Sequence, residues 1–509
     1  MMIKGIVYTA KRILGNLYVR FRIKSISIEV AELFFQHNGE YDFKRYDMIV
    51  RLLAVENYFG KNDFGFNLYR RMQAARVNRD WEDPAVERFH KLIKSYDNRG
   101  YDTTSPIILD KNLHLIDGSH RMALAMYYHT KQINAIVKPI TFNTFYGIEW
   151  FKINGFTNDE CNKMIAKYEE LKNYYSTPFI CTLWNPINAY YDDITKKLGL
   201  FGDIREVLDF ELTKDEYVFY TKGIYSVDDI EKWKIEKKLE HMQVYDKGLN
   251  KLRMVALSLK CPNFRLKDKT NTSLSQQCEL IKQMIRDRYK DRIDNYFHDI
   301  IVHIGDNFTQ NRFIYSLLKM PNINLTEILD DLRDLKYVIV KYEVPYMPTD
   351  FPIHYALGKD LDIVCSGKEE YDKVLSCLQY RLRNYRKYYN IRVIEEKDSS
   401  GCEYRTLFRL EQENNFLVFQ FDISSTLLTD INSSAFTKEI IDTRKKLSVF
   451  YIPSEKYELI IRLLELHQNP EKQHHLEYIN NHSNSLDSEL CDKYLLFNWR
   501  DLCYQEKSN

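Results

Sequence analysis

The sequence predicts a multidomain protein of mixed α+β and α/β class, and three observations carry this prediction. The chain has 509 residues, which corresponds to two to four domains at about 100–200 residues per domain. Hydrophobic residues make up 44% and charged residues 28% of the chain, as in proteins with packed cores. Short apolar runs typical of strands alternate with longer stretches of helical periodicity.

Changes in composition and pattern divide the chain into a basic amphipathic helix, three domains and a polar C-terminal tail. These five segments are residues 1–30, 31–148, 149–328, 329–475 and 476–509. We expect each of the three domains to bury its own core, because each is long enough to do so.

The composition also excludes several classes of protein. Lys+Arg (73) and Asp+Glu (72) nearly cancel, which argues against a surface dedicated to nucleic acid. The nine cysteines are scattered without a C-x-x-C pair, which indicates free thiols in a reducing cytosol. No apolar run approaches the 18 or so residues of a membrane span. We therefore expect a cytoplasmic protein.

The first 24 residues contain basic side chains and no acidic one, and their apolar residues fall on one face of a helix. The basic residues are Lys4, Lys11, Arg12, Arg20, Arg22 and Lys24. Such a helix lies on an anionic membrane surface, here the inner face of the cell membrane, or packs on the next domain with its basic face in water. The pattern leaves both interpretations open.

In the 31–148 segment, two short apolar runs are followed by a D-G-S-H-R turn and a helical pattern. A glycine turn between a strand and a helix presents free backbone N–H groups, which bind anions. Gly118 allows close approach of a ligand, Ser119 and His120 can donate, and Arg121 offers a bidentate phosphate partner. Asp117 is placed to hold Mg²⁺ or to accept a proton from a hydroxyl group. The alternative is an ordinary turn with Ser119 as helix cap.

The strand, I-D-G-S-H-R and helix resemble the nucleotide-binding box of the ParB/sulfiredoxin-like fold, over roughly residues 45–140. Sulfiredoxins carry G-C-H-R at this point, and free serine kinases of that fold carry D-G-H-H-R. Because Ser119 stands where sulfiredoxins have their reactive cysteine, the resemblance implies a kinase rather than sulfinic-acid repair. Its expected activity is ATP- or CTP-dependent phosphorylation of a small hydroxyl compound.

The same resemblance implies roles for individual residues of this segment. His120 and Arg121 would bind the nucleotide phosphates, and Asp117 would serve Mg²⁺ or the acceptor hydroxyl. Kinases of this type also use an upstream glutamate, for which Glu56 is the candidate.

The middle segment, 149–328, matches no family that we recognise, and its clearest motif is "HDIIVHIGDNFTQNRFIYSLL". A buried strand is expected to end at a G-D-N turn, with a helix beginning near Thr309. Ligands of open α/β sheets bind at the carboxyl ends of strands. We therefore predict a phosphate- or nucleotide-binding group made of His303, Asp306, Asn307 and Arg312. The alternative is a core histidine followed by an ordinary Asp-Asn turn.

The 329–475 segment contains a D-x-D pattern in a predicted strand and a third aspartate near the end of a later strand, "NFLVFQFDISS". Asp360 and Asp362 point to the same side because side chains alternate along a strand. Together with Asp422 they can hold divalent metal ions for phosphoryl or nucleotidyl transfer. The alternative is a solvated strand edge.

This pattern resembles the DNA polymerase beta-type nucleotidyltransferase superfamily over roughly residues 335–430. The resemblance implies that Asp360, Asp362 and Asp422 are catalytic carboxylates that bind Mg²⁺. The superfamily normally has a Gly-Gly or Gly-Ser pair upstream, where this chain supplies only Gly358. The domain is accordingly a divergent transferase or a degenerate scaffold.

Three functional hypotheses follow from these patterns. The first is a bifunctional transferase of phosphorus-containing groups, a kinase fused to a nucleotidyltransferase-like domain. It would use ATP or CTP, Mg²⁺ and a small hydroxylated or phosphorylated acceptor, in the synthesis or modification of surface polysaccharide. The second is a ParB-like nucleic-acid-binding protein or nuclease, which the neutral charge disfavours. The third is a nucleotide sensor without catalytic activity.

Overall fold

The computed structural model describes most of the chain, and its elements are mixed helices and sheets, as the sequence predicts. The described residues are 24–39, 42–77, 84–100, 102, 104–142, 145–242, 248–267, 270–294, 296–297, 300–397, 403–427 and 433–503. The basic helix predicted over residues 1–24 lies outside them except for Lys24. That residue begins strand β1 (Lys24–Glu29), within the 1–30 segment. Among the residues described, no helix is long and apolar enough to cross a lipid bilayer.

The chain forms two compact units, which are considered separately here. The first contains residues 24–210, 241–242 and 251–312, and the second contains 211–240, 248–250 and 313–503. The middle segment predicted from the sequence, 149–328, is therefore divided between the two units.

The first unit begins with a four-stranded sheet in the order β1-β4-β2-β3. Strand β4 (Gln132–Val137) pairs antiparallel with β1 and parallel with β2 (Ile107–Leu109), and β2 pairs antiparallel with β3 (Leu115–Asp117). The helices of this part are α2 (Val30–Gln36), α3 (Tyr46–Tyr58), α4 (Gly65–Val77), α5 (Pro84–Arg99), α6 (Ser119–Tyr127), α7 (Ile148–Ile153) and α8 (Asn158–Tyr175).

Helix α3 is the centre of this part because it contacts α4, α6 and α8. The sequence pattern suggests one apolar stripe, yet every residue from Tyr46 to Val55 is buried. The reason is that neighbours cover the helix on several sides, which obliges even the polar Asp47 and Arg51 to find partners inside.

A second sheet of the first unit has the order β10-β5-β7-β6. Its strands are β5 (Phe179–Leu183), β6 (Gly202–Leu212), β7 (Asn250–Leu259) and β10 (Val302–Ile304). The short strands β8 (Phe264–Leu266) and β9 (Ser273–Ser275) form a separate pair. The helical elements after α8 and before the next sheet are η1 (Asn185–Tyr190), α9 (Tyr191–Leu198), α10 (Lys214–Tyr225), α11 (Lys232–His241), α12 (Gln276–Tyr289), η2 (Lys290–Arg292), α13 (Phe308–Leu318) and α14 (Leu325–Asp331).

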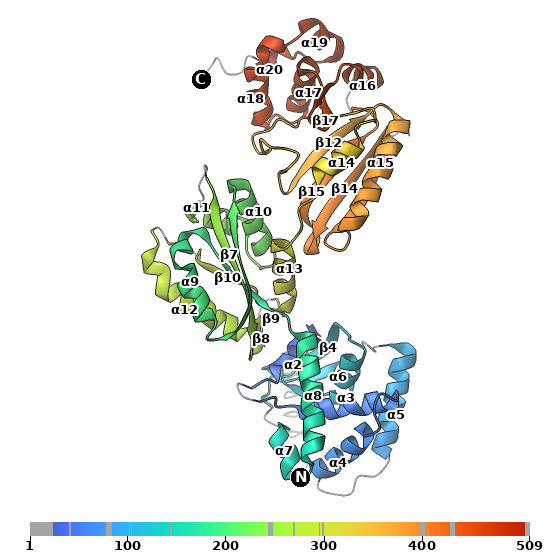
Figure 1. Ribbon diagram of the computed structural model, residues 1–509, viewed down its shortest axis with the longest axis vertical. Coiled ribbons are helices and arrows are strands. Elements are labelled where there is room, and N and C mark those ends of the chain that lie inside the picture. The colour runs from blue at the N-terminus through green and yellow to red at the C-terminus, as the bar shows by residue number, and fades with distance from the viewer. Residues whose placement is uncertain are drawn as a thin grey trace, which may run out of the picture. The chain divides into compact units, whose positions relative to one another are not determined.

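The second unit is built on a five-stranded sheet in the order β11-β12-β15-β14-β13. Its strands are β11 (Tyr337–Val340), β12 (Lys359–Cys365), β13 (Asn390–Lys397), β14 (Tyr404–Gln412) and β15 (Phe416–Ser424). Strands β12 and β15 are parallel, and the other neighbours pair antiparallel. Helix α15 (Lys368–Leu382) lies along this sheet and contacts β12 and β15 (Figure 1).

The C-terminal part of the second unit is helical and packs on the β11–β12 side of the sheet. After the one-turn helices η3 (Arg383–Tyr385) and η4 (Glu413–Asn415), its elements are α16 (Ser433–Asp442), β16 (Lys445–Leu447), β17 (Phe450–Ile452), α17 (Glu455–Gln468), α18 (Gln473–Asn481), η5 (Ser483–Ser485), α19 (Ser488–Tyr494) and α20 (Arg500–Cys503). Helices α17 to α20 gather together in Figure 1.

Residues 476–503 were predicted to be a polar surface tail, and the structure shows a different arrangement. Leu476, Ile479, Tyr494 and Trp499 are buried in one core with Val338 of β11. Their apolar side chains are dispersed among polar ones in the sequence, so the average composition is polar. In the folded unit these apolar side chains pack together into the core.

Candidate metal-binding site in the second unit

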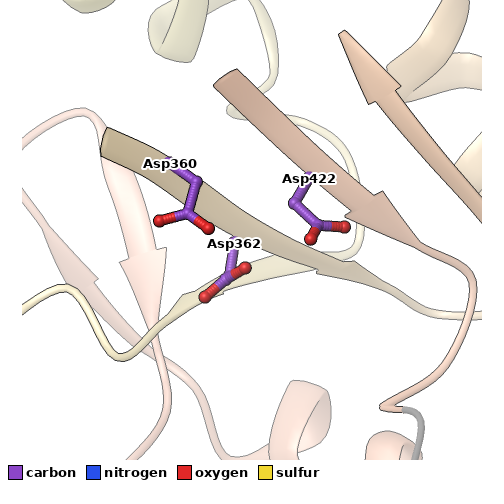
Figure 2. A group of neighbouring side chains, drawn as sticks. All are labelled: Asp360, Asp362 and Asp422. Carbon is purple, nitrogen blue, oxygen red and sulfur yellow. The ribbon is translucent and has the colours of Figure 1, made fainter. Parts of the chain in front are cut away.

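The structure brings together the three aspartates that the sequence singles out. Strands β12 and β15 are adjacent and parallel, and Asp362 is the register partner of Asp422. Asp360 lies two residues before Asp362, on the same side of β12, while Leu361 and Ile363 are buried on the other. One carboxylate oxygen of each aspartate lies within 4.8 Å of the other two. Figure 2 shows the three side chains directed toward one another from two strands.

Lys341 is the cation that contacts the D-x-D pair, and it comes directly after β11. Its ammonium Nζ lies 3.0 Å from Asp362 Oδ2 and 3.0 Å from Glu465 Oε2 of α17. The backbone N–H of Lys341 donates to Glu458 of α17, at 3.0 Å. Lys341 has a φ of 56°, a left-handed conformation that costs a non-glycine residue free energy. Contacts with α17 hold the residue in this conformation at the site.

Arg405 of β14 orients the third aspartate. Its Nε and Nη2 donate to the two carboxylate oxygens of Asp422, at 2.9 and 2.5 Å. This bidentate geometry fixes the plane of the carboxylate, because a guanidinium offers two parallel donors. Asp422 is 8% exposed, so the ion pair also compensates its burial.

The pKa shifts show how strongly the carboxylates crowd one another. Burial raises the pKa of Asp360, and the nearby charge of Asp362 raises it further. Burial also raises the pKa of Asp362, which Lys341 opposes and Asp422 reinforces. Burial alone would raise the pKa of Glu465, but Lys341 and Lys472 bring it down to about 2. The site therefore holds more negative charge than its cations neutralise at the D-x-D pair.

Two cavities border the D-x-D pair. One has a volume of about 410 Å³ and is lined by the three aspartates together with Lys341, Arg405 and Lys472. The other measures about 340 Å³, and Asp360 and Asp362 line it as well. Its remaining polar lining includes Tyr342, Tyr346, Lys359, His474 and His475. Space for two ligands thus exists beside the same carboxylates.

The donor set fits a divalent metal ion. Three carboxylates offer only oxygen ligands, which Mg²⁺ and Mn²⁺ prefer. Lys341 and Arg405 already contact Asp362 and Asp422, so an incoming cation shares these carboxylates with them. Asp360 is the most exposed of the three aspartates, so a metal ion would approach the group from its side.

Sequence reasoning missed Lys341, Arg405, Glu465 and Lys472. The first two are single basic residues at the ends of apolar strand patterns, "YVIVK" and "YRTLF". That position is the one local signal available, because a charge next to a buried strand requires a partner. Glu465 and Lys472 carry no comparable signal.

The D-G-S-H-R turn has the expected strand, glycine turn and helix. Gly118 is left-handed, with φ of 100°, and is the N-cap of α6 without a side-chain cap. Ser119 begins the helix and accepts a hydrogen bond from Arg45, so it is not the helix cap of the alternative interpretation. His120 Nε2 lies 2.8 Å from the hydroxyl of Tyr69.

Three other predicted residues of this segment are engaged elsewhere. Arg121 donates to the carbonyl oxygens of Ser105 and Pro106, at 2.5 and 2.6 Å, rather than extending toward the turn. Asp117 is exposed and 3.9 Å from Arg121. Glu56 forms an ion pair with Lys167 of α8, at 2.5 Å. These contacts give the three residues structural partners and leave their catalytic roles as predictions.

Residues of the group predicted around the G-D-N turn have protein partners, and their phosphate-binding role stays a prediction. Strand β10 pairs antiparallel with β5, which in turn is antiparallel to β7. The rule for carboxyl ends of parallel strands therefore does not apply here. Asp306 contacts Lys267 and Lys282, and Arg312 contacts Glu29.

The other two residues of that group are buried. The Asn307 side-chain amide donates to the carbonyl of Ser273, at 3.1 Å, and its oxygen accepts from the Gln310 N–H, at 3.0 Å. His303 lies within β10 and is 5% exposed. These contacts support the alternative interpretation, a core histidine followed by a structural turn.

Comparison with known proteins gives little further information. No family model matches the sequence, and no curated protein matches it either. Among solved structures, the chain is similar to a candidate nucleotidyltransferase from H. pylori, with 12% identity and a TM-score of 0.18, over 35% of this chain and 86% of that one. It is also similar to JHP933 from Helicobacter pylori, with 14% identity and a TM-score of 0.18, over 35% of this chain and 84% of that one. TM-scores this low establish no family.

Proposed function

We propose that the second unit is a metal-dependent transferase of phosphorus-containing groups. It would move a nucleotidyl group from ATP or CTP to an oxygen of a small hydroxylated or phosphorylated acceptor, with release of pyrophosphate. One observation supports the proposal above all. Asp360, Asp362 and Asp422 come from two parallel strands, and their oxygens lie within 4.8 Å of one another. Carboxylates this close repel one another, and a bound divalent cation would relieve that repulsion.

The residues of the site would divide the work between them. The three aspartates would hold Mg²⁺, which supplies charge stabilisation to the reacting phosphate when bound. Arg405 keeps the plane of the Asp422 carboxylate fixed. Lys341 is the counter-ion shared by Asp362 and Glu465, and its ammonium would also be placed to contact a phosphate oxygen of the nucleotide.

The basic side chains of the cavity beside the three aspartates can compensate for the missing glycine pair. A transferase must compensate the charge of a triphosphate, and polymerase beta-type enzymes do this partly with that turn. Here Lys341, Arg405 and Lys472 line one cavity with the aspartates. Once metal ions neutralise the aspartates, these three side chains would be available to a triphosphate, and this supports a divergent transferase over a degenerate scaffold.

The test is transfer of label from α-³²P-labelled ATP or CTP with Mg²⁺ or Mn²⁺ and pools of sugar phosphates, polyols, amino acids and RNA ends. We expect label in a small molecule with the wild type and none with Asp360→Asn/Asp362→Asn. Asp372→Asn is the matched control, because Asp372 is an exposed carboxylate on α15 that pairs with Lys368 and does not line the cavity of the three aspartates. Label that survives in the double variant would refute the proposal.

The remaining functional hypotheses stay predictions. A kinase at the D-G-S-H-R turn requires transfer of the γ-phosphate, which the same assay with γ-³²P-labelled nucleotide measures. A role in surface polysaccharide requires a sugar or polyol acceptor, and membrane contact depends on residues 1–23, which lie outside the described part. Label on RNA ends would favour the nucleic-acid alternative, and nucleotide binding without transfer would favour the sensor.

A further inference from the structure

A third cavity, in the first unit, has a lining of opposite charge. It measures about 400 Å³ and lies between α3, α4, α5 and the beginning of α6. Its cationic lining consists of Arg51 of α3, Arg76 of α4 and Arg88 of α5. Asp117 is the one acidic residue in the lining, and its side chain is 69% exposed. The cavity is therefore strongly electropositive.

The buried wall of the cavity carries an uncompensated charge. Asp47 is fully buried and pairs with both Arg45 and Arg51, at 2.7 and 2.9 Å. Two guanidinium groups thus share one carboxylate. Arg51 is 2% exposed, and its Nε–H has no acceptor among the described residues. Two guanidinium groups beside one carboxylate leave this wall with net positive charge, and an anion in the cavity would offset the cost of burying that charge.

The first turn of α6 faces the same cavity through Ser119 and His120. This nine-residue helix begins at Ser119, and its N-cap Gly118 provides no side-chain cap, so the first-turn N–H groups stay available to a ligand. The pKa of His120 is lowered to about 2, first by burial and then by the charges of Arg51 and Arg76. The ring is consequently neutral and adds hydrogen-bonding capacity without further charge.

We propose that this cavity binds a phosphate group, as free phosphate or as part of a nucleotide. Arginine is suited to this ligand because its planar fork matches the spacing of phosphate oxygens. Arg51, Arg76 and Arg88 come from three different helices and carry the recognition, whereas Arg121 of the D-G-S-H-R motif is held by backbone carbonyls. The site lies wholly in the first unit and needs no metal ion. It is thus independent of the transferase proposed for the second unit.

The experiment measures binding of inorganic phosphate, AMP, ATP and CTP to the full chain by calorimetry, in EDTA and at low salt. The main variant is Arg76→Ala/Arg88→Ala, since both residues are exposed and can be replaced without opening the core. The matched control is Arg99→Ala, which changes an exposed arginine of the same α5 helix that is not part of the cavity lining. The second control is Asp360→Asn/Asp362→Asn.

We expect the wild type and both controls to bind, and the double arginine variant to bind at least tenfold more weakly. Binding of inorganic phosphate would define a phosphate site, and binding of nucleotides alone would define a nucleotide site; both uphold the proposal. No binding of any of the four probes at millimolar concentration would overturn it. Equal binding by the double arginine variant, or loss of binding in the aspartate variant, would overturn it as well. The last result would not affect the proposed transferase.

Discussion

Replacing Lys341 by methionine tests whether its ammonium compensates the negative charge of the candidate metal site. The substitution keeps the length of the side chain and removes the ammonium that lies 3.0 Å from both Asp362 and Glu465. The two carboxylates then face each other without their shared counter-ion. We expect the second unit to lose stability and to depend on a divalent cation to regain it.

The magnitude follows from the geometry. At 3.0 Å, each ion pair is worth about 5 kcal/mol at an effective dielectric constant of about 20. Desolvation of the three groups offsets much of this attraction, and breaking a fully buried pair costs about 3–5 kcal/mol. The Lys341 side chain is 21% exposed and that of Asp362 is 25% exposed, which weakens the pair. We therefore expect Lys341→Met to lose about 2–4 kcal/mol.

The assay is urea unfolding of the full chain with and without Mg²⁺, followed by hydrogen exchange in β12 and β15. In the absence of metal, the variant should unfold at lower urea than the wild type. Added Mg²⁺ should restore the variant by more than it stabilises the wild type, because the metal ion replaces the ammonium beside Asp362. Lys368→Met is the control, since Lys368 pairs with Asp372 at the surface and should cost less than about 1 kcal/mol.

Two results would refute this reasoning. If Lys341→Met unfolds at the same urea concentration as the wild type, the ammonium does not balance these carboxylates. If Mg²⁺ raises the stability of both proteins equally, the metal ion and the ammonium do not share a site.

Three further predictions concern pH and backbone conformation. Burial raises the pKa of Asp360 and Asp362, so protons compete with the metal ion for these carboxylates. The affinity for Mn²⁺ should therefore increase with pH above the ordinary carboxylate range near 4. A Mn²⁺ affinity that does not change with pH would contradict this. Burial, followed by the charge of Glu29, raises the pKa of Glu32 in the first unit to about 8. The stability that this carboxyl provides is complete below its unfolded pKa and is lost as pH rises through 8, by up to about 1.4 kcal/mol per pH unit. Urea titrations of Glu32→Gln between pH 5 and 9 should lack this loss, and equal slopes in both proteins would refute the assignment. Gly118→Ala should cost roughly 2–3 kcal/mol in thermal unfolding, because φ is 100° and the new Cβ would lie 2.6 Å from a side chain of β2. Gly60→Ala, with φ of 75° and open space around it, should cost only about 1 kcal/mol. If the two variants lose the same stability, steric contact with β2 does not contribute to the cost at Gly118.

Features that depend on residues close together in the sequence could be predicted before the structure was known. Asp360 and Asp362 share a side because alternation is a property of any strand, and the apolar residues between and after them mark β12 as buried. The strand before Gly118 and the helix after it are likewise visible in the local pattern. The convergence of Asp422 with the D-x-D pair was predictable because two buried strands of one domain tend to be neighbours.

Contacts between residues that are far apart in the sequence became visible in the folded structure. Lys341, Arg405 and Glu465 reach the aspartates from β11, β14 and α17, and no local pattern states which strands become neighbours. The prediction for the group at His303 assumed a parallel sheet, whereas β10 pairs antiparallel with β5; strand direction is set by pairing partners far along the sequence. In the first unit, packing turns Arg121 toward backbone carbonyls and places Arg51, from α3, in the cavity instead. The chemistry of a side chain follows from its residue type, but the partners that it contacts depend on how the whole unit packs.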